Sequence, residues 1–210
     1  MAKQRSVYFC QNCGYESAKW LGKCPSCEQW NSFAEEIVQK NESKNEWRQD
    51  SHSRVSKPEL LGEISSKPEH RISTQDLELD RTLGGGMVPG SLILIGGEPG
   101  IGKSTLMLQL ALSIKGKKTL YVSGEESDQQ IKMRADRLSA SLNESTWLLT
   151  ETNTRNIFTA ANDLSPAIMI IDSIQTLHSP ILDGVAGSVG QVRQCAAEIL
   201  KFAKETGTVV

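Results

Sequence analysis

Residues 91–105 read SLILIGGEPGIGKST, and this stretch decides the fold. Its apolar first part predicts a buried strand over 91–96. The glycine-rich part fits the pattern G-x-x-x-x-G-K-[ST], directly after that strand and at the start of a predicted helix. Glycines let backbone N–H groups surround a phosphate, and a helix N-terminus adds a favourable dipole. We therefore predict a phosphate-binding loop made of Gly97, Glu98, Pro99, Gly100, Ile101, Gly102, Lys103 and Ser104.

Three side chains at the end of this loop have predicted roles. Lys103 is expected to reach the β- and γ-phosphates of a nucleotide, and the Ser104 hydroxyl to bind Mg²⁺. Thr105 is expected near the α-phosphate. An acid for the same magnesium ion is predicted at the end of IMIID, where Asp172 follows four apolar residues at the carboxyl end of a strand.

Two adjacent glutamates, Glu125 and Glu126, follow a predicted strand at 119–123. If that strand neighbours the phosphate-loop strand, both carboxylates emerge at the sheet edge that holds the γ-phosphate. One of them would then polarise the attacking water, and we prefer Glu125 for this role. The alternative is an acidic pair that stabilises the N-terminus of the next helix.

From residue 71 onward, predicted strands and amphipathic helices alternate, which is typical of a mostly parallel α/β sheet. The residues 208–210 read as the start of a further strand, so we expect an incomplete sheet and a truncated chain. Cys195, between apolar residues of a helix, is expected to be an inert buried thiol. The predicted strands cover 91–96, 119–123, 146–149 and 167–171, and the predicted helices cover 103–114, 127–139, 154–164 and 188–205.

Four of the five cysteines form the pattern C-x2-C-x10-C-x2-C near the N-terminus. Each two-residue gap lets a pair of sulfurs turn toward one ion, and four thiolates complete a tetrahedral structural zinc site. Disulfides, a rubredoxin-like iron site and redox chemistry are the less favoured alternatives. The predicted zinc ligands are Cys10, Cys13, Cys24 and Cys27.

Composition divides the chain into a zinc-binding module at 1–34, a flexible linker at 35–70 and a RecA-like ATPase core at 71–210. A short surface helix at 35–40 is an alternative for the start of the linker. The module is locally basic, so its aromatic side chains either pack around the metal or stack on nucleic-acid bases. These aromatic residues are Tyr8, Phe9, Tyr15, Trp20 and Trp30.

Composition excludes several classes of protein. The formal net charge of −2 excludes a chain that binds DNA by bulk positive charge, although not a local basic patch. No run of residues approaches the apolar length of a membrane span, and the N-terminus has no signal-peptide pattern. We therefore expect a cytoplasmic protein.

The motifs in their order along the chain resemble one family. They are CQNCGYESAKWLGKCPSCEQWNSF at 10–33, LDRTLGGGMVPGSLILIGGEPGIGKSTLMLQ at 79–109, YVSGEES at 121–127 and IMIIDSIQTL at 168–177. Together they resemble the bacterial RadA (Sms) family of RecA-superfamily DNA repair ATPases. The resemblance implies a RecA-like P-loop core preceded by a rubredoxin-like zinc ribbon, with ATP, Mg²⁺ and Zn²⁺ bound.

The same resemblance implies a DNA-stimulated ATPase that drives branch migration or unwinding of recombination intermediates. It implies single-stranded or branched DNA as a partner, together with a recombinase, a replicative helicase or both, and a homo-oligomeric ring for the full-length protein. Residues 97–105 would form the nucleotide cradle, with Lys103, Glu125 and Glu126 as catalytic residues and Asp172 as the magnesium acid. The resemblance also implies that a full-length protein would continue beyond residue 210 into a Lys-Asn-Arg-Phe-Gly motif and a Lon-protease-like domain, so we expect this chain to be truncated. The alternatives are a fragment that binds ATP and zinc without hydrolysis, or another P-loop phosphotransferase.

Overall fold

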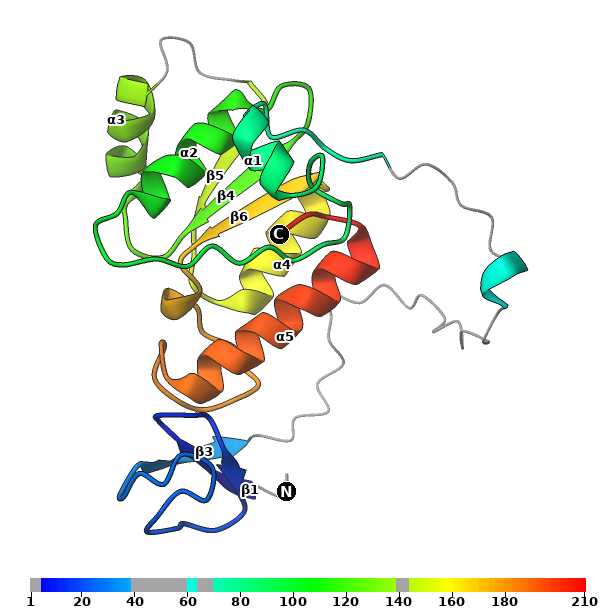
Figure 1. The fold of residues 1–210 in the computed structure, drawn as a ribbon. Helices are drawn as coiled ribbons and strands as arrows, with labels where there is room; N and C mark the ends of the chain where they lie inside the picture. Colours follow the sequence, from blue (N-terminus) through cyan, green and yellow to red (C-terminus); the bar gives the residue numbers. More distant parts are fainter. Residues whose placement is uncertain (1–4, 39–59, 64–69, 139–143) are drawn as a thin grey trace.

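The computed structural model of the chain describes residues 5–38, 60–63, 70–138 and 144–210 (Figure 1). Most of the predicted linker at 35–70 therefore lies outside the described residues. A single turn of 3-10 helix, η1 (Leu61–Glu63), is described within it. The described chain forms a small antiparallel sheet at the N-terminus and a larger α/β core.

The N-terminal module is a three-stranded antiparallel sheet of order β2-β1-β3. Its strands are β1 (Arg5–Cys10), β2 (Glu16–Ser17) and β3 (Phe33–Val38). The surface helix considered for residues 35–40 is wrong over its described part, because that part pairs with β1 as a strand. The local sequence pattern did not predict this strand, because its paired residues lie between 23 (Cys10 and Phe33) and 33 (Arg5 and Val38) positions earlier in the chain.

The core has three layers, with helices on both faces of a parallel sheet of order β5-β4-β6 (Figure 1). The predicted α/β class is confirmed. Helices α2 and α3 cover one face of the sheet, and α4 and α5 cover the other. The strands are β4 (Thr119–Ser123), β5 (Thr146–Thr150) and β6 (Ile168–Asp172), and the helices are α1 (Leu77–Thr82), α2 (Lys103–Ser113), α3 (Asp128–Leu138), α4 (Thr154–Leu164) and α5 (Val189–Thr206).

Two extended segments continue the hydrogen bonding beyond β6. Val209 donates to Ala167 and accepts from Met169, at 3.0 and 2.8 Å. On the side of segment 208–210 that faces away from β6, the Val210 amide donates to the Ser91 carbonyl at 2.9 Å, and the Val210 carbonyl accepts from the Ile93 amide at 2.8 Å. The expected further strand at 208–210 thus lies between β6 and the phosphate-loop segment.

The prediction of a buried strand at 91–96 is wrong. The segment is extended and hydrogen-bonded at 91–93, but Leu92 and Leu94 are 40% and 84% exposed. Its described hydrogen-bonding neighbour is the short segment 208–210, and Ile93 packs, partly buried, against the apolar cluster on the α2 face. Apolar composition alone does not report how many neighbours a strand has.

Helix ends agree closely with the sequence signals. The Asn153 side chain caps α4 by accepting from the Arg155 amide, and Ser188 caps α5 by accepting from the Gln191 amide. Gly207 ends α5 in the left-handed conformation, with φ of 76°. Helix α1, capped by Asp76, was not predicted.

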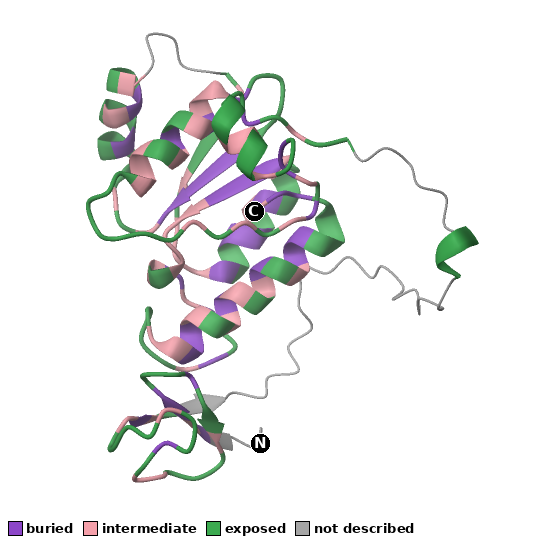
Figure 2. Cartoon of the chain, in the orientation of Figure 1, coloured by how far each residue is buried: buried purple, intermediate pink, exposed green. Residues whose placement is uncertain are grey.

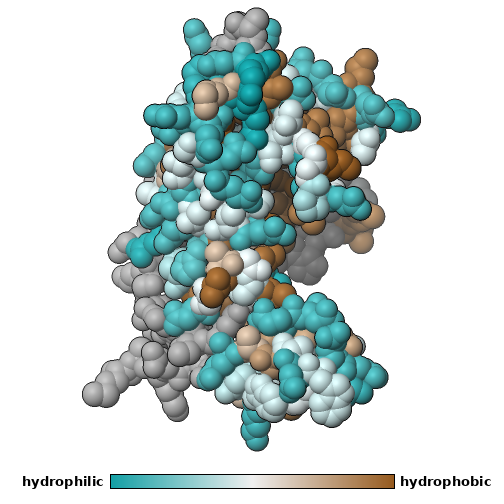
Figure 3. Space-filling view, turned by 90° about the vertical axis from the view of Figure 1, so that its left-hand side faces the viewer, coloured by the Kyte–Doolittle hydropathy of each residue, from teal (hydrophilic) through white to brown (hydrophobic). Residues whose placement is uncertain are grey.

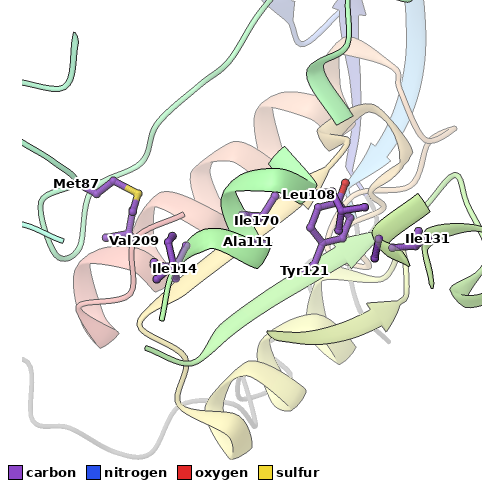
Figure 4. Packing of buried hydrophobic residues seen from close by; sticks show 10 residues of the cluster. Met87, Leu108, Ala111, Ile114, Tyr121, Ile131, Ile170 and Val209 are labelled. Atoms are coloured by element: carbon purple, nitrogen blue, oxygen red, sulfur yellow. The ribbon is translucent and has the colours of Figure 1, made fainter. Parts of the chain in front are cut away.

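The buried side chains form one apolar cluster on each face of the sheet, shown in purple in Figure 2. Strand alternation explains the division, because successive side chains of β4 point to opposite faces. Tyr121 lies in the cluster toward α2 and α3 (Figure 4), whereas Leu120 and Val122 pack toward α4 and α5. On the latter face, the rings of Phe158 and Phe202 stack with centroids 4.9 Å apart.

The N-terminal module lies against the first turns of α5 (Figure 1). Val7 and Phe9 of β1 form a small buried cluster with Leu182 from the loop before α5. The Arg193 guanidinium donates to the Gly14 carbonyl. A Cβ at Gly14 would lie 2.7 Å from Val189 Cγ1, so glycine is required at this close approach.

The outer surface of the described chain is largely polar on the face in Figure 3, with apolar side chains gathered in a few brown areas. None of the helices in the described ranges combines the length and the apolarity that crossing a membrane requires.

Candidate functional site

The phosphate loop, residues 97–104, connects the extended segment 91–93 to helix α2. Gly100 and Gly102 have φ of 79° and 100°, which L side chains rarely adopt, so the loop depends on glycine at both positions. No side chain caps the N-terminus of α2, where Gly102 is the N-cap. The Lys103 ammonium donates to the carbonyls of Gly97 and Glu98, each at 2.8 Å. The loop thus curls around its own cation beside the uncapped N-terminus of a helix, an arrangement suited to an anion.

Asp172 joins the loop to the central sheet. Ser104 Oγ, on the first turn of α2, donates to Asp172 Oδ1 at 3.0 Å. The Tyr121 hydroxyl donates to the other oxygen, Asp172 Oδ2, at 2.7 Å. Burial, together with the bond to Asp172, raises the pKa of Tyr121 well above its ordinary value. The tyrosine therefore remains a neutral donor at working pH.

These side chains fit a magnesium ion. Mg²⁺ prefers oxygen ligands and is held in P-loop proteins by a hydroxyl and a carboxylate. Ser104 and Asp172 supply this donor set from elements far apart in the sequence, 3.0 Å from one another. They would hold the ion at the carboxyl end of β6, directly beside the start of α2.

The two glutamates have different surroundings. Glu125 is exposed and accepts from the Ser173 hydroxyl at 2.9 Å, next to Asp172. Glu126 is paired with Arg134 of α3 at 2.7 Å, and the two side chains are 33% and 17% exposed. The premise that β4 neighbours the phosphate-loop strand is wrong, because β4 lies between β5 and β6. Glu125 nevertheless follows the carboxyl end of β4. The last residue of β4, Ser123, pairs with Asp172, the last residue of β6, so the two strands end side by side.

The four cysteines converge in the N-terminal module, with all Sγ atoms within 4.8 Å of one another. The Sγ atoms of Cys10 and Cys27 are 3.6 Å apart, and those of Cys13 and Cys24 are 3.5 Å apart. Four sulfurs around zinc at about 2.3 Å lie about 3.8 Å apart, so the cluster fits a tetrahedral ion. In the described chain the thiols form no disulfide, so this cluster does not support the disulfide alternative.

The two cysteine pairs have the same backbone geometry. The Gly14 amide donates to the Cys10 carbonyl at 2.8 Å, and the Glu28 amide donates to the Cys24 carbonyl at 2.9 Å. Both donors have positive φ, 72° and 59°. A hydrogen bond with Ser32 lowers the pKa of Cys10 to about 6, whereas burial and hydrogen bonds with the other cysteines raise the pKa of Cys13 to about 11. Binding of a metal would therefore displace a proton from the cluster.

The aromatic side chains of the module behave differently from one another. Phe9 is buried, as expected for packing within a small core. Trp20 and Trp30 are 54% and 70% exposed, and both rings lie within 4 Å of the Cβ position at Gly22. Packing around the metal therefore does not account for the two tryptophans.

Sequence reasoning missed Tyr121, Ser173 and Arg134. The available signals were a hydroxyl-bearing aromatic inside the strand TLYVS and a serine directly after the predicted magnesium acid. No sequence signal pairs Arg134 with Glu126, because their contact depends on how α3 is oriented. The roles assigned to the predicted site residues stay predictions.

Comparison with known proteins agrees with this geometry. Residues 8–35 match the model of a rubredoxin metal-binding domain, and residues 58–210 match the model of an AAA domain. The chain is 45% identical to DNA repair protein RadA of Halalkalibacterium halodurans over 100% of its own length and 46% of the relative's. It is 47% identical to RadA of Bacillus subtilis over 99% of its own length and 46% of the relative's. It is 50% identical to RadA of Streptococcus pyogenes serotype M6 over 97% of its own length and 45% of the relative's.

The chain thus spans slightly less than half the length of these curated relatives. The resemblance to RadA stated from the motifs is confirmed over the whole of this chain. Its phosphate loop, parallel sheet and helices all lie within the range of the AAA-domain match. With a rubredoxin-type metal-binding domain at its N-terminus, the chain belongs to the AAA-domain family.

Proposed function

We propose that the chain carries the zinc module and the ATP-hydrolysing site of a DNA repair ATPase. The observation that supports this most directly is the contact between Ser104 of the phosphate loop and Asp172 of β6. This contact brings the phosphate loop together with the predicted magnesium acid, as a magnesium-nucleotide site would require. The names of the relatives support a role in DNA repair.

The proposed reaction is attack of water on the γ-phosphorus of ATP. The new P–O bond forms as the bond to the β–γ bridging oxygen breaks, which releases ADP and phosphate. Lys103 stabilises charge on the β- and γ-phosphate oxygens, and Glu125 accepts the proton of the attacking water. Mg²⁺, when bound, neutralises charge on the same phosphate oxygens.

The surroundings of the two glutamates favour Glu125 over Glu126 as the base. Arg134 donates to the Glu126 carboxylate at 2.7 Å and directs it toward α3. In the described part of the chain, the one hydrogen bond recorded for the Glu125 carboxylate is the bond that Oε1 accepts from the Ser173 hydroxyl. Its second oxygen is therefore available to a water. Thr105 would lie one residue further along α2, near the α-phosphate.

A binding and turnover experiment tests this proposal. ATP affinity and hydrolysis by the purified chain are measured with and without single-stranded DNA. Lys103→Ala is expected to abolish tight binding, whereas Lys115→Ala, just past the other end of α2, is the matched control and keeps it. Glu125→Gln is expected to bind ATP but lose turnover, and Glu126→Gln to retain turnover.

Unchanged ATP affinity in Lys103→Ala would contradict the phosphate-loop assignment. Binding without turnover in the wild-type chain would favour the non-hydrolysing alternative. Branch migration, unwinding, ring assembly and contact with a recombinase or replicative helicase are proposals for the longer protein. They rest on the family resemblance, and the DNA-stimulated rate is their first test.

A further inference from the structure

Tyr121 is a buried tyrosine at the centre of the core sheet. Its side chain is 1% exposed and packs in the apolar cluster beneath α2 and α3 (Figure 4). A buried hydroxyl is costly unless it has a partner. The partner of this hydroxyl is Asp172 Oδ2, at 2.7 Å.

The strand register explains how the hydroxyl reaches this oxygen. Tyr121 pairs with Ile170 across β4 and β6, and Ser123 pairs with Asp172. Because side chains alternate along a strand, Asp172 shares its face with Ile170 and thus with Tyr121. That face is covered by α2, whose first turn carries Ser104.

The two oxygens of Asp172 therefore have separate donors. Oδ1 accepts from Ser104 and Oδ2 accepts from Tyr121. A carboxylate held by one hydrogen bond still rotates about its Cβ–Cγ bond, whereas two donors on different oxygens fix that rotation. A phenylalanine at position 121 would fill the same apolar space without fixing it.

We propose that Tyr121 is a positioning residue for the magnesium site, because its hydroxyl fixes the orientation of the Asp172 carboxylate. This inference rests on the proposed function of Asp172. Because Tyr121 is 1% exposed and its hydroxyl donates to Asp172, it would act on the metal site through the carboxylate. Loss of the Tyr121 hydroxyl is therefore expected to weaken the contribution of Mg²⁺ to nucleotide affinity. Nucleotide binding without metal is expected to stay intact.

The test measures binding of a fluorescent ADP analogue to the 210-residue chain, in EDTA and across a Mg²⁺ titration. Tyr121→Phe is compared with the wild type and with Thr119→Val. The control removes another fully buried hydroxyl from β4, and it has no described contact with Asp172. The Mg²⁺ concentration for half-maximal effect is expected to rise about tenfold in Tyr121→Phe, the size of one lost hydrogen bond to a charged group. Affinity in EDTA is expected to stay within about twofold.

A variant in the Asp172→Asn background separates positioning from general damage. If Tyr121 acts through Asp172, Tyr121→Phe adds no further shift once the carboxylate is gone. An unchanged Mg²⁺ requirement in Tyr121→Phe, or an equal shift in Thr119→Val, would overturn the inference while the proposed function stands. A wild-type chain that binds no nucleotide would instead overturn the proposed function, and the inference with it.

Discussion

The zinc module is expected to unfold when its metal is removed, while the α/β core stays folded. Among its described side chains, the buried apolar residues other than cysteine are Val7, Phe9 and Phe33. Each contributes about 1.5–3 kcal/mol on burial. A structural zinc ion contributes about 10–16 kcal/mol to such a domain. The metal therefore stabilises the module more than its three buried apolar side chains do together, and the module depends on it.

Hydrogen exchange measured by mass spectrometry tests this dependence. After treatment with a strong zinc chelator, backbone amides in residues 7–35 are expected to lose their protection, and those of β4 and β6 to keep it. Cys24→Ser is expected to give the same exchange pattern without chelator. Cys195→Ser, which lies outside the four-cysteine cluster, is the control and keeps its zinc. Protected amides in 7–35 after verified loss of zinc would refute the reasoning.

Three further outcomes are expected. Phe158→Ala removes a ring stacked on Phe202 and is expected to lower the free energy of unfolding by about 3–5 kcal/mol in a denaturant titration; a loss below about 1 kcal/mol would contradict the packing. Burial raises the pKa of Cys195 to about 12, so at pH 8 iodoacetamide is expected to label this thiol only after unfolding, as mapped by mass spectrometry. Arg193→Ala removes the donor to the Gly14 carbonyl, and limited proteolysis is expected to release the zinc module faster than in the wild type; an unchanged cleavage rate would show that this contact does not hold the module.

Local signals predicted the helices of the core well. The segment 188–205 was expected as a helix, and α5 covers Val189–Thr206 with Ser188 as its cap. Capping residues and a 3.6-residue period act within a few residues of each other, so a single sequence displays them. The phosphate loop could be predicted equally well, because its glycine pattern encodes a backbone conformation that few other functions require.

Long-range contacts could not be predicted in the same way. The pattern of 91–96 indicates an apolar strand, but not that its hydrogen-bonding partner is the short segment 208–210. Similarly, the residues 119–123 read as a strand, yet only the register across β4 and β6 brings Tyr121 to Asp172. The different partners of Glu125 and Glu126 depend on the placement of β6 and α3, which no local period encodes.

The order of synthesis has a consequence for when the nucleotide site becomes usable. The Ile93 amide donates to the Val210 carbonyl, so the extended segment before the phosphate loop has no described partner in the sheet until Val210 has been made. At ribosomal speeds of about 5–20 residues per second, the intervening roughly 120 residues take about 6–24 s. During this interval the zinc module can already take up its metal, while the nascent loop remains without its anchor. Newly made chains would thus acquire zinc before nucleotide.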